Sequence, residues 1–423
     1  MAQLAVPPAR RPHRAEGYLL TMTAAVPGSA AVSARRRRTR EQLLAVLARH
    51  DALSRAELAA LTGLSRSAVG ACVTDLVEDG LASEGPAADR PAAGPGRPAA
   101  VVRLRRSAGI VLGLDFGHTH VTAALADTEG RILAERGETL DVDGRPEDAL
   151  DTGAQLAAAV LDATGHGMHE VLGAAAGIPG PIDVRTSVVR EPTILASWIG
   201  LDPEAELGRR LGRRVAVAND ADMGARAEHL YGAGRGIDDL VYVKASHGIG
   251  AGLILGGRPY RGATGIAGEI GHTQLPGAIN WCRCGNQGCL ETVVSVGAVH
   301  RRLAHVLGGT FGDALEEGGE ALPSMAQLAS SPAAARVLTD AGRTIGRVLA
   351  DLINCLNPAA VVLGGELGSA GEPLVAGVRE SIDRHAGQAG AGAVEVLAGR
   401  LGARAELLGA VGTAIGQAAA TRA

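Results

Sequence analysis

The sequence predicts an α/β protein that begins with a winged helix-turn-helix and has a structural zinc site in its larger C-terminal part. Three observations support this fold class. Capped helices surround a glycine turn near the N-terminus, apolar strands alternate with helical patterns after residue 107, and one histidine and three cysteines occur in a short span. A chain of 423 residues is long enough for two or three domains.

Charge and composition restrict the possible functions. Residues 1–110 have 16 Arg against 9 Asp and Glu, a net +7, whereas the remainder has 25 basic and 36 acidic residues, a net −11. A basic region on an acidic body suggests that one end binds nucleic acid. Five cysteines, three of them clustered, indicate metal binding in a reducing compartment. Without a long apolar run or a recognisable signal peptide, we expect a soluble cytoplasmic protein with no membrane partner.

The N-terminal quarter predicts a tail followed by a DNA-binding domain. Residues 1–38 are rich in Pro, Ala and Arg without periodicity, so we expect a disordered basic tail. Residues 39–106 predict a winged helix-turn-helix. After a first helix, a capping box of Ser54 and Glu57 starts a second, and Gly63 lies in the turn before a third. The Pro- and Gly-rich segment that follows suits a winged hairpin.

The second and third helices of this domain form the helix-turn-helix motif. In this motif the later helix enters the major groove and contacts DNA bases, so we expect the third helix to do so here. Its first residues should therefore face bases, whereas two arginines outside it should contact phosphates. A generic three-helix packing motif without DNA is the alternative. The predicted DNA-binding residues are Ser65, Arg66 and Ser67, with Arg55 and Arg97 on phosphates.

The body of the chain, from residue 107 onward, reads as strands and helices in alternation. The apolar runs are short and end in glycine-containing turns, and the helical segments carry apolar residues on one side. In order, the predicted elements are a strand-turn-strand over 109–127, a helix over 148–163, a strand and turn over 171–183, a strand and helix over 215–228, a hairpin within 240–272, a strand and turn over 358–374, and a final apolar helix.

A metal site is predicted between residues 269 and 291. This stretch contains His272, Cys282, Cys284 and Cys289. One His and three Cys suit tetrahedral Zn²⁺, and a complete set of four protein ligands is typical of structural sites. A redox pair or ordinary buried thiols are the alternatives, and no second pair of histidines follows that would indicate a DNA-reading zinc finger.

The same stretch, with G-E-I-G-H followed by C-R-C-G-N-Q-G-C-L-E, resembles the signature of the ROK family of repressors, unassigned reading frames and sugar kinases. The resemblance implies a ROK-type sugar-binding domain over 107–423 with the two-lobed actin-like ATPase fold of sugar kinases. The lobes would cover about 107–227 and 228–400, with the C-terminal helix returning to the first lobe. It also implies that the four ligands hold structural zinc, with the histidine facing the sugar through its second ring nitrogen.

The sugar site follows from the same resemblance. Carboxylates accept hydrogen bonds from vicinal hydroxyls, and the family uses two glutamates of this stretch in that way. A strand ending in Asn219-Asp220 supplies the remaining groups; in family kinases this aspartate is the base that deprotonates a sugar hydroxyl. Helix capping and sugar binding without chemistry is the other role open to it. The expected sugar set is Asn219, Asp220, Glu269, His272 and Glu291, with Asp220 catalytic only in a kinase.

Three glycine-containing turns resemble the nucleotide loops of family kinases. Four departures from the kinase pattern argue against an active kinase: His118 for a glycine, His247 for a small hydroxyl residue, Glu366 for a small residue, and Thr193 for a sugar-contacting asparagine. The two histidines, which alter both phosphate hairpins, also argue against Mg-ATP binding. The candidate nucleotide residues are Asp115, Gly117, Thr119, Gly248, Gly250, Gly364 and Gly365.

The leading interpretation is a sugar-responsive transcriptional regulator, expected to be a repressor. It would bind operator DNA as a homodimer or homotetramer and a sugar or sugar derivative in its cleft, and lobe closure would change the spacing of the DNA-binding domains. The alternative is an ATP-dependent, glucokinase-like sugar kinase fused to a DNA-binding domain. A third possibility is a regulator that responds to a protein partner, as some family repressors do.

Overall fold

The protein, described here by a computed structural model, divides into two compact units, Met1–Arg103 and Leu104–Ala423. Three predictions lie outside the described residues: the disordered tail over 1–38, the phosphate contact of Arg97 and the replacement at Thr193. The described residues are 39, 40, 42, 43, 46, 47, 50, 52–78, 82–86, 100–104, 109–189, 196–308, 311 and 322–421.

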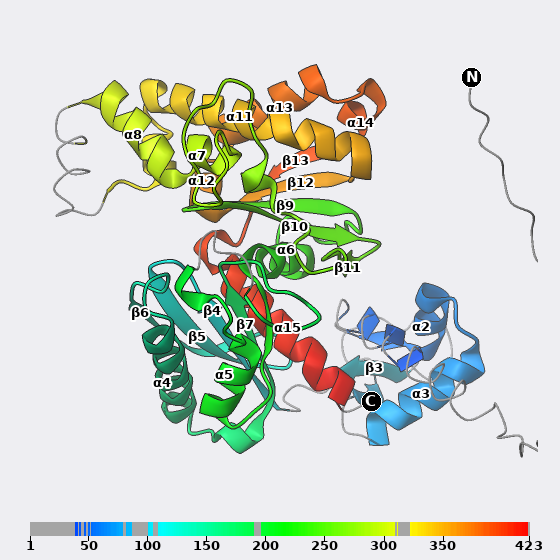
Figure 1. The fold of residues 1–423 in the computed structure, drawn as a ribbon. Coiled ribbons are helices and arrows are strands. Elements are labelled where there is room, and N and C mark those ends of the chain that lie inside the picture. The colour runs from blue at the N-terminus through cyan, green and yellow to red at the C-terminus, as the bar shows by residue number, and fades with distance from the viewer. Residues whose placement is uncertain are drawn as a thin grey trace, which may run out of the picture. The chain divides into compact units, whose positions relative to one another are not determined.

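The N-terminal unit contains the predicted helices beside a three-stranded sheet of order β1-β3-β2 (Figure 1). The Ser54–Glu57 capping box is present, and Gly63, with φ 68°, ends the helix that it starts. Leucine and valine side chains from the helical residues form the core. The elements are β1 Leu53–Ser54, α2 Arg55–Thr62, α3 Arg66–Glu78, β2 Ala82–Pro86 and β3 Ala100–Leu104, with helical residues also between 39 and 47.

The first lobe of the body is built on a five-stranded sheet of order β6-β5-β4-β7-β8. Its central strand β4 is buried along its whole length because both faces are covered. Leu112 and Leu114 pack against α4 and α5, whereas Val111 points to the opposite face. The elements are β4 Ile110–Phe116, β5 His120–Asp127, β6 Ile132–Thr139, α4 Pro146–Thr164, η1 Met168–Glu170, β7 Val171–Ile178, η2 Ala196–Trp198, α5 Pro203–Leu211 and β8 Ala216–Asn219.

The second lobe is a five-stranded sheet of order β11-β10-β9-β12-β13, with helices stacked on its outer face (Figure 1). Strand β9 is antiparallel to β10 and parallel to β12. The elements are β9 Leu240–Ala245, β10 Ile249–Leu255, β11 Arg258–Pro259, η3 Ile270–His272, α7 Leu290–Val294, α8 Val296–Leu307, α10 Met325–Leu328, α11 Pro332–Leu356, β12 Ala360–Gly364, α12 Gly365–Gly368, α13 Glu372–His385, α14 Gln388–Ala393 and β13 Glu395–Ala398.

Two helices, α6 (Asp220–Tyr231) and α15 (Ala405–Thr421), lie between the two sheets (Figure 1). After η4 (Gly402–Arg404), α15 packs its apolar side chains on the first sheet. The two helices approach so closely that a Cβ atom at Gly409 would lie 1.9 Å from the Met223 carbonyl oxygen. Side chains at the start of both helices are thereby brought to the junction of the lobes. Among the described helices, none combines the length and apolarity needed to cross a membrane.

Candidate functional site

The four predicted zinc ligands come together. The donor atoms of His272, Cys282, Cys284 and Cys289 all lie within 4.8 Å of one another. Cys282 Sγ is 3.6 Å from His272 Nδ1, and Cys284 Sγ is 3.6 Å from Cys289 Sγ. Ligands bound at about 2.0–2.3 Å to a tetrahedral zinc lie about 3.3–3.8 Å from one another, so these four donors can hold such an ion.

The loop that carries the cysteines is folded by its own backbone. Cys282 N donates to the Asn286 carbonyl at 2.8 Å, and Gly288 N donates to the Asn280 carbonyl at 2.8 Å. Gly288 has φ 82°, and a Cβ atom there would lie 2.6 Å from the Ala278 carbonyl oxygen. Only glycine therefore allows the two sides of the loop to approach, which places the cysteines beside the histidine.

The two predicted glutamates lie on different sides of the His272 ring. Nε2 is 3.8 Å from a Glu269 carboxylate oxygen, and Nδ1 is 3.9 Å from a Glu291 oxygen. Cys282 Sγ also donates a hydrogen bond of 3.0 Å to Glu291. The ring thus presents Nδ1 to the cysteines and Nε2 to a carboxylate, and both carboxylates lie within about 4 Å of the predicted metal ligand.

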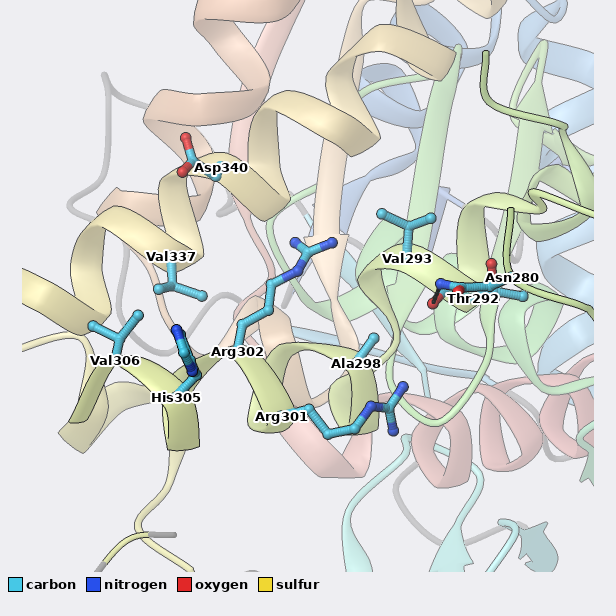
Figure 2. Close-up of a pocket in the computed structure, with 10 residues that line it drawn as sticks. All are labelled: Asn280, Thr292, Val293, Ala298, Arg301, Arg302, His305, Val306, Val337 and Asp340. Atoms are coloured by element: carbon cyan, nitrogen blue, oxygen red, sulfur yellow. Dashed lines mark hydrogen bonds between the residues drawn. The ribbon is translucent and has the colours of Figure 1, made fainter. Parts of the chain in front are cut away.

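A surface cavity of about 560 Å³ is lined by residues of α7, α8 and α11 and by Asn280 (Figure 2). Asn280 and Thr292 line one end, and Arg301, Arg302 and His305 of α8 make it basic. None of the predicted metal, sugar or nucleotide residues lines this cavity. It is therefore distinct from the site that the sequence predicts.

Asn219 and Asp220 lie at the end of β8, where α6 begins. Asn219 Oδ1 accepts from Ala221 N at 2.8 Å and caps the helix, and its amide donates to the Gly180 carbonyl at 3.1 Å. Asp220 is 7% exposed, and its carboxylate is 2.6 Å from Lys244 Nζ. The capping role that was considered for Asp220 is therefore performed by Asn219, whereas Asp220 is engaged in a largely buried ion pair.

Asp220 and the zinc loop flank the same end of β10. A Cβ atom at Gly250 would meet the Ala221 side chain at 3.3 Å, and one at Gly271 would lie 2.2 Å from the Ile249 carbonyl oxygen. The helix that starts at Asp220 and the segment that leads to His272 thus pack against neighbouring residues of one strand. The predicted sugar residues consequently gather around the start of β10.

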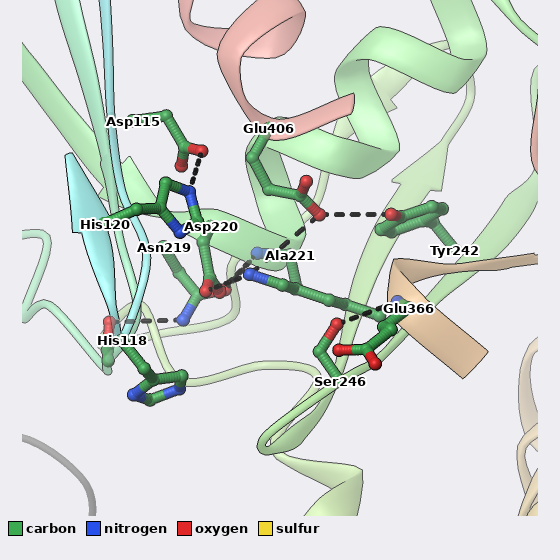
Figure 3. A network of polar contacts seen from close by, with 12 residues as sticks. Asp115, His118, His120, Asn219, Asp220, Ala221, Tyr242, Ser246, Glu366 and Glu406 are labelled. Carbon is green, nitrogen blue, oxygen red and sulfur yellow. Dashed lines mark hydrogen bonds and ion pairs between the residues drawn. The ribbon is translucent and has the colours of Figure 1, made fainter. Parts of the chain in front are cut away.

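Lys244 is a site residue that the prediction missed. It comes from β9, pairs with Asp220 and lies 4.0 Å from Glu406 of α15, whose carboxylate accepts from Tyr242 at 3.2 Å (Figure 3). Burial opposes the charge, but Asp220, Glu406 and Asp115 together raise the pKa of Lys244 above its ordinary value. Burial raises the pKa of Glu406 to about 7, and Lys244 works against that shift.

The first predicted nucleotide hairpin adds a second pair to this centre. Asp115, near the end of β4, accepts a hydrogen bond of 3.2 Å from His120 Nε2. This contact raises the pKa of His120 above its ordinary value, although burial opposes the shift. The other Asp115 oxygen is buried and has no hydrogen-bond partner among the described residues. The His120 imidazole lies against Gly117, where a Cβ atom would be 2.1 Å from the ring as it stands. Thr119 is exposed.

The tips of the two nucleotide-type hairpins touch through their histidines. The His118 and His247 rings lie 5.7 Å apart, and His118 Nδ1 is 2.8 Å from an Asp143 carboxylate oxygen. Asp143 also lies 3.7 Å from Arg283 of the zinc loop. Burial and the neighbouring His118 lower the pKa of His247. These contacts connect the first lobe to the second where the hairpins face each other.

The remaining predicted nucleotide residues lie close to the second hairpin. Gly248 precedes β10, Gly250 faces α6, Gly364 ends β12 and Gly365 begins α12. Gly365 has φ 71°, and a Cβ atom there would be 2.6 Å from the Ala245 carbonyl oxygen. The Ser246 hydroxyl already accepts from Glu366 N at 3.0 Å. The loops that the sequence analysis selected therefore lie next to each other. Some of their hydrogen-bonding groups, such as the Ser246 hydroxyl, are already paired within the protein.

In the N-terminal unit, Ser65, Arg66 and Ser67 are exposed at the start of α3. The Ser65 hydroxyl caps this helix by accepting from Ala68 N at 3.2 Å. Arg55 instead forms a two-pronged ion pair with Glu84 of β2 and donates to the Gly70 carbonyl. Its predicted phosphate contact thus has an intramolecular competitor.

A winged helix-turn-helix and a two-lobed body of sugar-kinase type define a DNA-binding regulator architecture. Residues 36–82 match the winged helix-turn-helix DNA-binding family, and residues 111–416 match the ROK family. The chain belongs to the ROK family. The resemblance seen in the sequence is thereby confirmed, as is the predicted α/β fold with an N-terminal winged helix-turn-helix.

The relatives differ in how much of this chain they cover. A putative xylose repressor of Caldicellulosiruptor is 26% identical over 88% of this chain and 94% of its own. The glucokinase of Thermotoga maritima is 31% identical over 71% of this chain and 95% of its own. A ROK family transcriptional regulator structure, described as a homolog of E. coli MLC, superposes with TM-score 0.70 at 24% identity and covers 92% and 98%.

Proposed function

We propose that this chain is a sugar-responsive transcriptional repressor. The observation that carries the proposal is that the DNA-binding unit and the sugar-kinase-like body occur together, as they do in repressor relatives matched over nearly their whole length. A family enzyme needs only the body, and the glucokinase relative covers about that much of the chain. The N-terminal winged helix-turn-helix would bind DNA and so allow the sugar-binding body to regulate transcription.

The proposed sugar site consists of Asn219, Asp220, Glu269, His272 and Glu291. Two carboxylates on either side of one imidazole offer acceptors to neighbouring hydroxyls, and the Asn219–Asp220 pair lies at the same end of β10. We propose that the Cys₃His cluster holds a structural zinc ion. Bound zinc would fix the loop that presents the two glutamates, without taking part in any reaction.

The proposed DNA contacts are made by the start of α3. Ser65, Arg66 and Ser67 are exposed there. An arginine side chain can donate two hydrogen bonds to a guanine edge. Arg55 and Arg97 would contact phosphates. Operator binding would involve a homodimer or homotetramer, since paired half-sites need paired reading helices. A sugar would act through its different affinities for the DNA-bound and free states.

The test measures DNA binding by the full chain. A duplex selected from a random-sequence library is expected to bind tightly, and Arg66→Ala should weaken it roughly 5- to 150-fold, equivalent to about 1–3 kcal/mol. Arg131→Ala, which changes an arginine that is 78% exposed in the body, is the matched control. One sugar in a panel should shift the affinity. Selection of no duplex, or indifference to every carbohydrate tried, would contradict the proposal.

A sugar kinase with a fused DNA-binding domain is the second candidate. The retained Asp220 and the 31% identity to a glucokinase favour it. Phosphorylation of a sugar by Mg-ATP, lost in Asp220→Asn, would establish this activity. We expect no turnover, because Asp220 is already paired with Lys244.

A further inference from the structure

Lys244 is the only lysine of the chain, against 40 arginines, and its side chain, which is 15% exposed, lies at the junction of the lobes. It reaches Asp220 at 2.6 Å and lies 4.0 Å from Glu406, and it interacts electrostatically with Asp115. These carboxylates come from the end of β4, the start of α6 and the start of α15, so the ammonium lies where three elements meet (Figure 3). An ammonium is a compact point charge that suits such a position better than a guanidinium.

We propose that the Lys244 ammonium takes the place of the divalent cation that a nucleotide-binding cleft of this fold requires, and thereby excludes Mg-ATP. Lys244 lies in the first strand of the second hairpin, near its tip, and Asp115 lies at the equivalent place in the first hairpin. A Mg²⁺ ion bound between these hairpins would need carboxylate oxygens as ligands. The nearest such oxygens face a fixed positive charge, which repels a second cation at the same point.

The loops around this centre do not fit nucleotide either. The Ser246 hydroxyl, which lies in the second hairpin, is occupied by Glu366 N. The two histidine rings contact each other at the hairpin tips. Asp143 and Glu366 add negative charge near those rings, and this disfavours a triphosphate. The residues present therefore do not fit the Mg-ATP that family kinases bind, because they suit neither its Mg²⁺ ion nor its phosphates.

The inference deepens the proposed function, because it rests on a body that binds sugar without phosphorylating it. Asp220 has one oxygen on Lys244 and the other on Ala221 N at 2.7 Å. A carboxylate held in this way by an ammonium and a backbone N–H can still accept a further hydrogen bond from a sugar hydroxyl. Lys244 is therefore a positioning residue that preserves the sugar-facing carboxylate and removes the need for a metal at this centre.

The experiment measures Mn²⁺ binding by the zinc-loaded full chain, using the electron paramagnetic resonance of free Mn²⁺. Lys244→Met should bind one Mn²⁺ at least tenfold more tightly than the wild type, and its melting temperature should rise on Mn²⁺ addition. Adding Asp115→Asn should abolish that gain. Arg343→Met is the matched control, since it also frees two carboxylates, Asp340 and Glu380, but on the surface. It should behave like the wild type.

A folded Lys244→Met variant that gains no Mn²⁺ affinity would overturn the proposal. If that variant does not fold, Lys244→Met combined with Glu406→Gln has one carboxylate fewer and is measured in its place. The wild type provides an independent test, because labelling with ¹⁵N-lysine gives a single side-chain ammonium resonance. This resonance should be unchanged by millimolar Mg-ATP, and a saturable shift would overturn the proposal. Neither readout depends on whether a sugar or an operator binds.

Discussion

Two polar clusters of the body each bring together groups that repel one another when they are ionised. They differ in the cation that can neutralise those groups. The Cys₃His cluster gathers donors that become mutually repulsive when its thiols ionise, so it depends on an added cation. The centre around Lys244 gathers carboxylates of three elements and contains its own cation. The first cluster would therefore take a metal ion from solution, as proposed above, whereas the second has its cation within the chain.

This difference predicts how each cluster responds to pH and to a chelator. Metal affinity falls as pH falls, because protons compete for the zinc ligands. The Lys244 centre has the opposite dependence, since Glu406 must ionise in a buried position as pH rises. A chelator should affect the loop between His272 and Cys289 and leave the junction of the lobes intact. The two clusters can thus be perturbed separately.

The largest effect is expected at the metal cluster. Cys284→Ser removes one of four ligands, and we expect zinc content to fall below about a tenth of one equivalent and the melting temperature to fall by roughly 10 °C. The physical reason is that metal binding free energy is gained only by the folded loop. Metal content after purification and thermal unfolding measure the two quantities.

Cys355→Ser is the matched control, because Cys355 is an exposed free cysteine outside the cluster. It should retain both zinc and stability. Unchanged metal content in Cys284→Ser would show that the four donors do not act as a metal site.

A smaller effect is expected from pH at the Lys244 centre. The folded-state pKa of Glu406, about 7, lies above its ordinary value of 4.5, so its protonated form is favoured by folding. The associated stability is present below pH 4.5 and is lost as pH rises through 7. Between pH 5.5 and 8 the wild type should lose on the order of 1–3 kcal/mol relative to Glu406→Gln.

Urea unfolding of both proteins at the two pH values measures this difference, and groups common to both, such as Asp222 with a pKa of about 6, cancel. Glutamine can still accept from Tyr242, so the hydrogen bond is retained. An equal pH dependence of the two proteins would mean that Glu406 does not titrate in this range.

The two clusters also differ in what the sequence could predict. The four predicted zinc ligands lie within 18 consecutive residues, so their spacing alone indicated a common site, and the family signature added the flanking glutamates. Asp115, Lys244 and Glu406 are separated by more than a hundred residues each, and only the packing of two sheets brings them together. The one available indication was the single lysine in an arginine-rich chain.

Contacts between segments that are distant in the sequence explain the other features that the sequence analysis did not predict. Arg55 was expected on phosphates from its charge and position, but Glu84, 29 residues later, holds it in the winged unit. His118 and His247 were recognised one at a time as departures from kinase loops, whereas their mutual contact required the structure. Helix caps such as that of Ser54 were predicted, because all the interacting groups lie within one turn.

The smallest effect is expected at the hairpin tips. Combining His118→Gly with His247→Thr restores residues of the sizes that family kinases use, yet Lys244 remains beside Asp220 in that variant. We therefore expect no binding of a fluorescent ATP analogue with Mg²⁺ at millimolar concentration. Adding Lys244→Met to the pair should produce measurable binding. Nucleotide binding by the histidine variant with Lys244 intact would instead mean that the tips, and not the internal cation, close this cleft to ATP.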